Sequence, residues 1–485
     1  MKIYILGICG TFMSGVAQLA IQKGFQVSGC DENIYPPISD VLKDLGVKID
    51  KGYSEKYYSE NTDLFIIGNV VSRGNPLMEK ILNEDKSFSS GPEFLFNYVL
   101  KDRHVVSIAG THGKTTTSAM ITKILLDFGI DAGYLIAGKV KDFSNSAELG
   151  NDKLFVIESD EYDTAFFDKR SKFIHYKPST LLINNLEFDH ADIFNNLDDI
   201  QKQFHHLIRS LPQNVKVLFP FEDDNIQTLL KNGFYSIKEP FNFEFSEKGW
   251  SMIINENKTS DFKVCFNGEL VNEISLKLIG EHNLRNAFAA FLTALSLGVT
   301  PNSIKNSLLN FKGVAKRMDF LGEKNTVSVY DDFAHHPTAI KFSLEALKKA
   351  DSSRKIICLL EMRSNTMLSG FHDEKISEAV FNADEVFLFS KNETQAKKII
   401  SQDPKINFCE SKEEFLKILR KKNYRKRILF VFLMVLLAEF NQRFLRIYET
   451  STIFFILVQK YFQRQKRLNQ NFQEIQFQLQ LLELS

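Results

Sequence analysis

Short apolar runs alternate with longer amphipathic segments over the first hundred residues. The runs KIYILG, FQVSGCD and DLFIIGN have the length and composition of buried strands, and MSGVAQLAIQKG has apolar positions spaced as in a helix. Strands that alternate with helices favour a parallel sheet with helices on its faces. We therefore expect residues 1–104 to form an α/β domain.

The same alternation returns twice further along the chain. The second segment carries the strand-like runs HVVSIAG, LFVIE and TLLINN and a more β-rich patch near residues 263–277. In the third segment, VSVYDDF, KIICLLE and DEVFLFS alternate with a helix-like stretch at 340–350. The pattern predicts an α/β chain of three domains, at 1–104, 105–310 and 311–425.

The pattern changes near the C-terminus. No glycine follows Gly370, no aspartate follows Asp403, and residues 426–485 are rich in Gln, Phe and Leu. A globular segment of this length should contain several turns, yet the residues that form turns are missing. We therefore expect residues 426–485 to be an aberrant tail that truncates the third domain.

Composition narrows the class of protein. The chain is 44% hydrophobic and 25% charged, as in soluble globular proteins. Its formal net charge is zero, so we expect no attraction to nucleic acid or to an acidic membrane. The five cysteines are scattered without a CxxC, the chain opens on a strand-like run without a leader, and the longest apolar run, ILFVFLMVLLA, is too short for a bilayer span. These features indicate a cytoplasmic protein.

The segment AGTHGKTTT, at 109–117, lies between a strand-like run and a helix-like one. A glycine turn in this place directs backbone N–H groups and the positive end of the helix toward an anion. The Lys114 ammonium would then reach the outer phosphates of a nucleotide, and the Thr115 hydroxyl would bind Mg²⁺. The strict P-loop has a glycine where Ile108 stands, so this is a shorter variant. The alternative is a structural turn before a core helix.

Acidic side chains follow two other predicted strands. Glu158 ends the run LFVIE, where a P-loop fold is expected to hold a Mg²⁺ ligand. Glu187, Asp189 and His190 follow TLLI, and carboxylates with an imidazole suit a second Mg²⁺. The alternative for each group is a polar loop with solvated charges.

Five ordered segments, GTHGKTT, ESDE, NLEFDH, GEHNLRNAFAA and YDDFAHHPT, together resemble the Mur ligase family of ATP-dependent amide-forming enzymes. Longer stretches, namely NVVSRGNP, ESDEYDTAFFDKRSKF, KQFHHLIRSLP and RSNTM, are similar to the branch of the family that adds a tripeptide. The likeness runs from Met1 to about residue 410. It implies a Rossmann-like UDP-binding domain, a central P-loop ATPase-like domain and a Rossmann-like C-terminal domain.

The reaction implied by the resemblance is peptide ligation in peptidoglycan recycling. ATP would convert the lactyl carboxylate of UDP-N-acetylmuramate into an acyl phosphate, which the amine of the tripeptide L-Ala-γ-D-Glu-meso-diaminopimelate then attacks. One alternative is the branch that adds L-alanine, and another is an inactive nucleotide-binding remnant. A dehydrogenase is more distant, and the sequence does not predict the oligomeric state.

The resemblance also implies which residues bind ATP and the metal ions. The ATP site would comprise Gly110, Thr111, His112, Gly113, Lys114, Thr115 and Thr116, with His282 and Asn283 on the adenine side and Arg317, Asp331 and His335 from the third domain. Thr115 and Glu158 would hold one Mg²⁺, and His190, with Glu187, the other. Lys114, Glu158, His190 and Arg317 would be the catalytic residues.

The two substrates would be held at opposite ends of the chain. The turn GICGTFMSG would bind the UDP-sugar through Gly7, Gly10, Thr11 and Met13, with Asp31 at the ribose. A dinucleotide fingerprint would need glycines where Cys9 and Phe12 stand, so UDP fits better than NAD. A bare Rossmann turn is the alternative. Arg363 and Asn365 are the candidates for the carboxylates of the tripeptide, since Arg suits a planar bidentate acceptor.

The chain departs from the family pattern in two places. Some Mur ligases bridge their metals with a carbamylated lysine, but that position here is Phe204 and the nearest lysine, Lys202, is two places away. We therefore do not predict carbamylation.

The second departure is the C-terminal ending. The family ends in a glycine-rich SNGxFGG segment, whereas residues 433–444 read LMVLLAEFNQRF. When the codons are read in a frame that starts two bases into the codon of Phe432, some codon choices for these residues give the family-like string SNGSFGGIQPKI. We hypothesise a frameshift upstream of Leu433. The alternative is a divergent helical tail.

Overall fold

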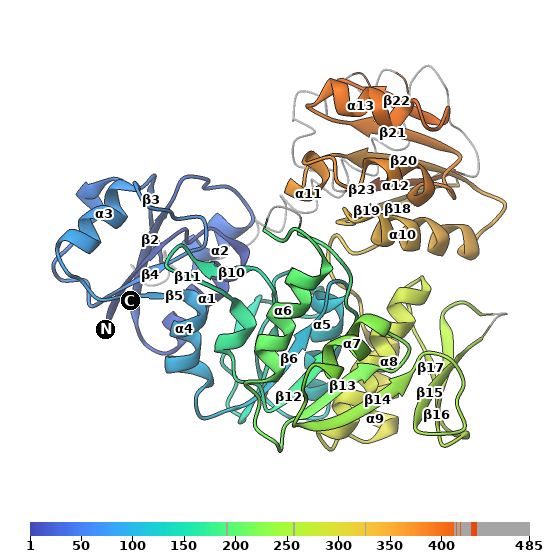
Figure 1. Cartoon of the computed structure of the whole chain (residues 1–485), viewed down its shortest axis with the longest axis horizontal. Helices are drawn as coiled ribbons and strands as arrows, with labels where there is room; N and C mark the ends of the chain where they lie inside the picture. The colour runs from blue at the N-terminus through green and yellow to red at the C-terminus, as the bar shows by residue number, and fades with distance from the viewer. Residues whose placement is uncertain are drawn as a thin grey trace, which may run out of the picture. The chain divides into compact units, whose positions relative to one another are not determined.

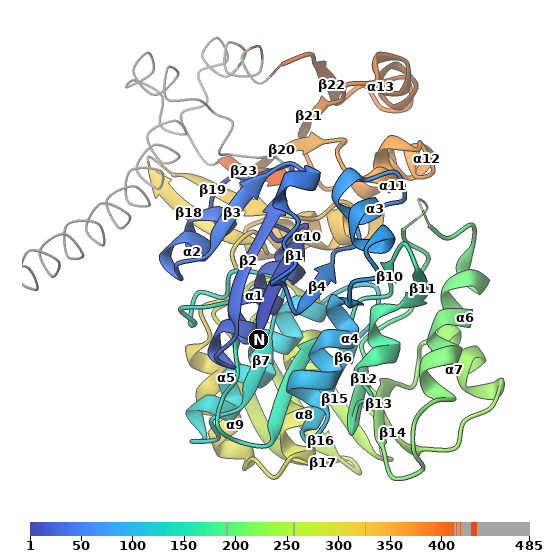
Figure 2. The same ribbon diagram turned by 90° about the vertical axis from the view of Figure 1, so that its left-hand side faces the viewer.

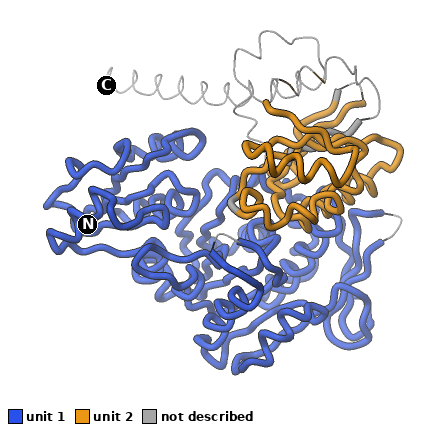
Figure 3. Tube along the Cα trace, turned by 45° about the horizontal axis from the view of Figure 1, so that its top comes forward, with its two compact units in different colours: residues 1–315 blue, residues 316–485 orange. Residues whose placement is uncertain are grey.

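The computed structural model describes residues 1–190, 193–255, 258–324, 326–411, 414, 418 and 428–433. They form two compact units, Met1–Ala315 and Lys316–Ser485 (Figure 3). Residues 311–315, which the sequence analysis assigned to the third domain, belong to the first unit. The predicted tail lies outside the described residues except for 428–433. No helix in the described part of the chain is long and apolar enough to span a bilayer.

The N-terminal part of the first unit is a five-stranded parallel sheet. Its order is β3-β2-β1-β4-β5, and Figure 2 shows β3, β2, β1 and β4 side by side. The first strand lies in the middle and buries four of its five residues. The strands are β1 (Lys2–Leu6), β2 (Gln26–Asp31), β3 (Lys48–Lys51), β4 (Leu64–Ile67) and β5 (Phe88–Ser90), and the helices are α1 (Thr11–Gln22), α2 (Ile38–Asp44), α3 (Pro76–Asn83) and α4 (Gly91–Leu95).

A ten-stranded sheet is the second large sheet of the first unit (Figure 1), in the order β17-β16-β15-β14-β13-β12-β6-β9-β7-β8. The strands are β6 (His104–Ala109), β7 (Gly133–Leu135), β8 (Ala147–Glu148), β9 (Leu154–Glu158), β12 (Thr180–Ile183), β13 (Lys216–Pro220), β14 (Ile237–Asn242), β15 (Trp250–Ile254), β16 (Asp261–Phe266) and β17 (Glu269–Ser275). The helices are α5 (Lys114–Asp127), α6 (Leu197–Ile208), α7 (Asp224–Lys231), α8 (Glu281–Ser296) and α9 (Pro301–Asn310).

Alternating side chains divide the central sheet between two cores. Leu182 packs with α5, α8 and α9, while its neighbours Leu181 and Ile183 pack with α6 and α7 on the other face. This is the period of two that a strand imposes. The core beneath α6 is continuous with that of the N-terminal sheet through residues such as Val16, so both parts belong to one compact unit.

A short hairpin and turn connect β9 to β12. They comprise β10 (Asp163–Ala165), β11 (Asp168–Ser171) and the 3₁₀ turn η3 (Lys172–His175). The two strands pair with each other in antiparallel orientation and belong to neither large sheet.

The second unit is a six-stranded sheet of order β18-β19-β23-β20-β21-β22. Its strands are β18 (Asp319–Lys324), β19 (Val327–Asp332), β20 (Lys355–Glu361), β21 (Glu385–Phe389), β22 (Ile406–Cys409) and β23 (Ile428–Leu433). Its helices are α10 (Pro337–Ala350), α11 (Asn365–Leu368), α12 (Asp373–Ala379) and α13 (Glu393–Ile400). All pairs are parallel except β18 with β19.

The strands that the sequence pattern predicts are all present, so the α/β expectation is confirmed. One strand was not anticipated. Residues 428–433, which the sequence analysis assigned to the tail, form β23 and pair in parallel with both β19 and β20. The apolar run ILFVFL has no local sign of this placement, because the two strands that flank it come from much earlier in the chain.

Candidate active site

The loop between β6 and α5 is built around two glycines in left-handed conformations. Gly110 has φ +130° and Gly113 has φ +80°. A Cβ on Gly113 would lie 2.3 Å from Asn286 Oδ1, and one on Gly110 would lie 2.9 Å from the carbonyl oxygen of Asn185. Only glycine fits this close approach. The loop is therefore a tight glycine turn at the start of a helix, the geometry that the predicted anion site requires.

Two asparagines that follow β12 hold this loop in place. The Asn185 side chain accepts from the backbone N–H of His112 at 2.8 Å and donates to the His112 carbonyl at 3.1 Å. Asn184 donates to Thr117 Oγ1 at 2.9 Å. The sequence analysis quoted this pair but gave it no role. Its position directly after a predicted strand was the available signal.

Lys114 begins α5 and is almost enclosed. Its ammonium donates to the Gly110 carbonyl at 2.7 Å and to Glu161 Oε2 at 2.8 Å. Burial alone would lower the pKa of Lys114, but the charges of Glu161 and Asp160 raise it. Glu161, which the sequence analysis did not select, keeps a lowered pKa despite its burial because of Lys114 and His190. The lysine is therefore held as a cation at the loop.

The structure brings together the predicted pair Thr115 and Glu158. The Thr115 hydroxyl donates to Glu158 Oε1 at 2.8 Å, and the backbone N–H of Ala137 donates to Glu158 Oε2 at 3.0 Å. A hydroxyl and a carboxylate at this distance are an oxygen donor set of the kind that Mg²⁺ uses.

His190 lies against the acidic loop that follows β9. Its Nε2 is 3.1 Å from Glu161 Oε1, and its ring lies 4.3 Å from that of Tyr162, centroid to centroid. Asp160, Glu161 and His190 each offer a ligand atom within 4.8 Å of the others, so they could hold a metal ion. His190 also has φ +59°, and such strain in a non-glycine residue is often found at functional sites.

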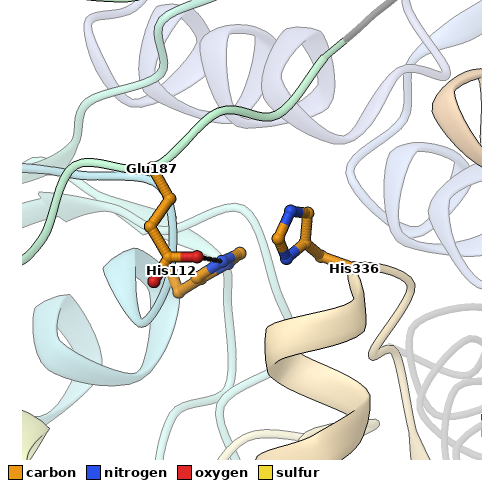
Figure 4. Close-up of side chains that lie close together, drawn as sticks. All are labelled: His112, Glu187 and His336. Carbon is orange, nitrogen blue, oxygen red and sulfur yellow. Dashed lines mark ion pairs between the residues drawn. The ribbon is translucent and has the colours of Figure 1, made fainter. Parts of the chain in front are cut away.

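Glu187 faces the loop rather than the acidic cluster. Its carboxylate Oε2 lies 3.6 Å from His112 Nε2, as the dashed line in Figure 4 marks. Its backbone N–H donates to Thr111 Oγ1 at 2.8 Å. Figure 4 also labels His336, which belongs to the second unit. The two predicted ligands Glu187 and His190 therefore have different partners.

The turn after β1, to which the sequence analysis assigned the UDP diphosphate, contains a left-handed glycine. Gly7 has φ +79°, and a Cβ there would lie 2.9 Å from Val70 Cγ2. Asp31 accepts from the backbone N–H of Cys9 at 2.9 Å, so its carboxylate braces the turn. Gly10 caps α1 and Thr11 begins it. The Met13 side chain is buried in the core, which leaves its backbone as the part available to a ligand.

The remaining candidates of the first unit lie in the first turns of α5 and α8. Thr116 is buried in α5. The Asn283 side chain donates to the Ile279 carbonyl at 2.7 Å, and His282 precedes it in α8.

The candidates in the second unit lie at the starts of α10 and α11 and near β18. Asp331 is buried near the end of β19, and His335 Nδ1 is 2.9 Å from the Phe333 carbonyl oxygen. The guanidinium of Arg317 lies 5.3 Å from the centroid of the Phe333 ring. Arg363 is exposed after β20, and Asn365 begins α11, with its side chain outside the described part.

The fold and the site define a P-loop enzyme with carboxylates at the ends of neighbouring parallel strands. Three family domains match the chain in order. The catalytic domain of the Mur ligase family matches residues 2–101, the Mur ligase middle domain matches 108–294, and the glutamate ligase domain matches 316–432. The chain therefore belongs to the Mur ligase family, whose members are ATP-dependent, amide-forming ligases.

The names of similar proteins point to one branch of the family. A protein of Escherichia coli K12, named UDP-N-acetylmuramate–L-alanyl-γ-D-glutamyl-meso-2,6-diaminoheptandioate ligase, is 47% identical over 390 residues, which cover 80% of this chain and 84% of that protein. A Haemophilus influenzae protein of the same name is 44% identical over 387 residues. An L-alanine ligase of Clostridium acetobutylicum is 31% identical over 388 residues, 80% of this chain and 82% of that protein.

Solved structures agree with this placement. The murein peptide ligase of Psychrobacter arcticus superposes with a TM-score of 0.72 at 35% identity, covering 90% of this chain and 96% of that one. The UDP-N-acetylmuramate-alanine ligase of Thermotoga maritima has a TM-score of 0.75 at 23% identity, covering 93% and 99%, and this likeness bears on the fold alone.

Proposed function

We propose that this protein joins the tripeptide L-Ala-γ-D-Glu-meso-diaminopimelate to UDP-N-acetylmuramate at the expense of ATP, as a step of peptidoglycan recycling in the cytoplasm. The observation that carries the proposal is the 47% identity to a ligase named for these substrates, over 84% of its length. The five cysteines, all free thiols, are in keeping with a reducing compartment.

The reaction would run in two displacements. A lactyl carboxylate oxygen attacks the γ-phosphorus of ATP and releases ADP, which leaves an acyl phosphate. The amine of the tripeptide then attacks the acyl carbon, loses a proton, and expels inorganic phosphate as the amide forms. Chemistry of this kind depends mainly on positioning and on neutralising phosphate charge.

The chain offers groups suited to that task. Lys114 would exchange its contact with Glu161 for the outer phosphates of ATP, and the loop that begins at Gly110 would hold them. Mg²⁺ would neutralise phosphate charge, with Thr115 and Glu158 as one set of ligands. His190 would serve a second ion, with Glu187 or the nearer Glu161. Their oxygen donors fit this ion.

The outer parts of the site are proposed on the resemblance to the family. His282 and Asn283 would contact the adenine, and Arg317, Asp331 and His335 would contact the nucleotide from the second unit. Gly7, Gly10, Thr11 and Asp31 would hold the UDP moiety. Arg363 and Asn365 would bind the carboxylates of the tripeptide.

The test is a substrate comparison on the purified protein. With ATP, Mg²⁺ and UDP-N-acetylmuramate present, the tripeptide should give phosphate release and a product of the summed mass less water. Free L-alanine should give neither. Lys114→Ala should abolish both signals, while Lys123→Ala, which removes a lysine paired with Asp127 on the same helix, should leave them within about twofold. Undiminished product formation by the Lys114→Ala variant would contradict the proposal.

The same assay also tests two alternative functions. Turnover with L-alanine and not with the tripeptide would favour the L-alanine ligase, a reading supported by the 31% identity to such an enzyme. ATP binding without phosphate release in the presence of both substrates would favour an inactive remnant, a reading motivated by the family match that ends at residue 432.

A further inference from the structure

The hairpin between β9 and β12 carries a lysine that none of the candidate sites uses. Lys172, at the start of η3, donates to Asp160 Oδ2 at 2.7 Å. Its ammonium also lies 5.5 Å from the centroid of the Tyr162 ring and 5.7 Å from that of Phe12. The side chain is only 12% exposed. Two parts of the first unit that are far apart in sequence, the first turn of α1 and the loop after β9, therefore surround the ammonium of Lys172.

Aromatic contacts fix the hairpin against the N-terminal sheet. The ring of Phe167 meets that of Phe88 at 5.1 Å, and Phe166 packs against the core that contains Phe65. Figures 1 and 2 both place β10 and β11 beside this sheet. The backbone N–H of Lys172 donates to the Tyr162 carbonyl at 3.0 Å, which fixes the root of the side chain. Lys172 is thus held at the junction between the turn after β1 and the loop after β9.

The partner of Lys172 is accessible on one side. Asp160 keeps 31% of its side chain exposed, so the ion pair opens to solvent. In the same loop, Glu161 pairs with Lys114 at 2.8 Å, as Asp160 pairs with Lys172 at 2.7 Å. One acidic loop therefore faces two ammonium groups, Lys114 from the ATP loop and Lys172 from the hairpin. An ammonium has three N–H donors, and the hydrogen bond to Asp160 uses one of them.

We propose that Lys172 binds the carboxylate of the acid substrate, the lactyl group of UDP-N-acetylmuramate, and positions it for the group held at Lys114. This inference rests on the proposed function. The diphosphate would lie at the turn whose helix begins with Thr11 and Phe12, and the reacting carboxylate must approach the ATP loop. Lys172 stands between these two places, with Asp160 as its carboxylate partner when no substrate is bound.

The test compares two nucleotide sugars that differ in the lactyl ether. Lys172→Met keeps the length of the stem against the two rings and removes the charge. The dissociation constant of UDP-N-acetylmuramate, measured by calorimetry, should rise about tenfold to a hundredfold, the value of a lost hydrogen bond to a charged group. The dissociation constants of UDP-N-acetylglucosamine and of ATP should not change. Lys172→Arg should recover part of the loss.

Two further variants separate a substrate contact from a structural one. Lys169→Met changes an exposed lysine of the same hairpin that pairs with Asp163, and it should leave both sugars unaffected. Asp160→Asn frees the ammonium of Lys172 and should keep or tighten binding of UDP-N-acetylmuramate. If Lys172→Met lowers the yield of folded protein, Lys172→Met with Asp160→Asn removes both charges and should show the same selective loss.

Several outcomes would overturn the inference. An equal loss for both sugars would assign Lys172 a structural role, no loss would remove it from the site, and a loss confined to the KM of the tripeptide would place it at the other substrate. Failure of the proposed function is a separate result, because the unchanged protein would then show no binding of UDP-N-acetylmuramate at all.

Discussion

Two glycines flank α5, and they differ in how much space surrounds them. Gly113 has both a left-handed backbone and the Asn286 amide oxygen where a Cβ would lie. Gly129, at the end of the same helix, has φ +89° but open space around it. An alanine at Gly129 would therefore test backbone strain alone, whereas an alanine at Gly113 would add a steric overlap with Asn286.

We predict that Gly113→Ala will abolish ATP binding and lower the thermal midpoint, because the added methyl group would overlap the Asn286 side chain and force the loop or that side chain to move. Gly129→Ala carries only the left-handed strain, about 1 kcal/mol, and should bind ATP normally. Calorimetric titration with ATP and a thermal melt measure both effects. Equal behaviour of the two variants would argue against the close approach as the cause.

The contact of His190 with Glu161 gives a pH prediction. Burial alone would lower the pKa of His190, but the hydrogen bond and charge of Glu161, with the charge of Asp189, raise it. A folded-state pKa above the unfolded value of about 6.5 contributes stability that is complete below that pH. This contribution is lost as the pH rises through the folded-state pKa.

His190→Gln should therefore lower the free energy of unfolding more near pH 5.5 than near pH 8, measured by urea denaturation without metal. In the unchanged protein, Mg²⁺ affinity should rise over the same interval, because a ligand imidazole must be neutral. Loss of stability that is the same at both pH values would show that the imidazole is not protonated in the folded protein.

At the scale of elements, α8 joins the ATP loop to the core of the ten-stranded sheet. Its first turns carry Asn283 and Asn286, and its middle is anchored by Phe288. That ring meets the rings of Phe241, Phe243 and Phe262 at 5.6, 6.4 and 6.3 Å, and the side chain is fully buried. The geometry of the loop thus rests on aromatic packing at some distance from it.

Phe288→Ala should lower the free energy of unfolding of the first unit by about 3–5 kcal/mol, since it removes a large buried ring and leaves a cavity. Phe245→Ala, at a residue that is 54% exposed, should change it by less than about 0.5 kcal/mol. Urea titrations followed by tyrosine and tryptophan fluorescence measure both. A small effect of Phe288→Ala would mean that the core around α8 collapses into the space.

At the scale of the whole chain, the family match and the last described strand end within one residue of each other. The glutamate ligase domain matches to residue 432 and β23 ends at Leu433. From Phe432 onward, some codon choices for these residues spell a glycine-rich, family-like ending in another reading frame. These facts agree with the hypothesis of a frameshift upstream of Leu433, near the end of β23.

Sequencing the DNA between codons 400 and 445 tests this hypothesis. We expect codons that encode SNGSFGGIQPKI in the shifted frame, and a gene restored to that frame should give a protein with higher ligase activity than the present chain. Codons unable to encode that string would remove the hypothesis. Equal activity of both proteins would show that the ending is dispensable.

The sequence by itself determined the α/β class, the loop at Gly110–Thr116 and the pairing of Thr115 with Glu158. These follow from local patterns, namely strand-length apolar runs and the residues that come directly after them. Only the tertiary structure decided the place of β23 between β19 and β20, the contact of His190 with Glu161 rather than Glu187, and the position of Lys172 beside Phe12. Each of these joins segments distant in sequence, and such contacts depend on how strands order within a sheet and how the hairpin packs, which no local pattern encodes.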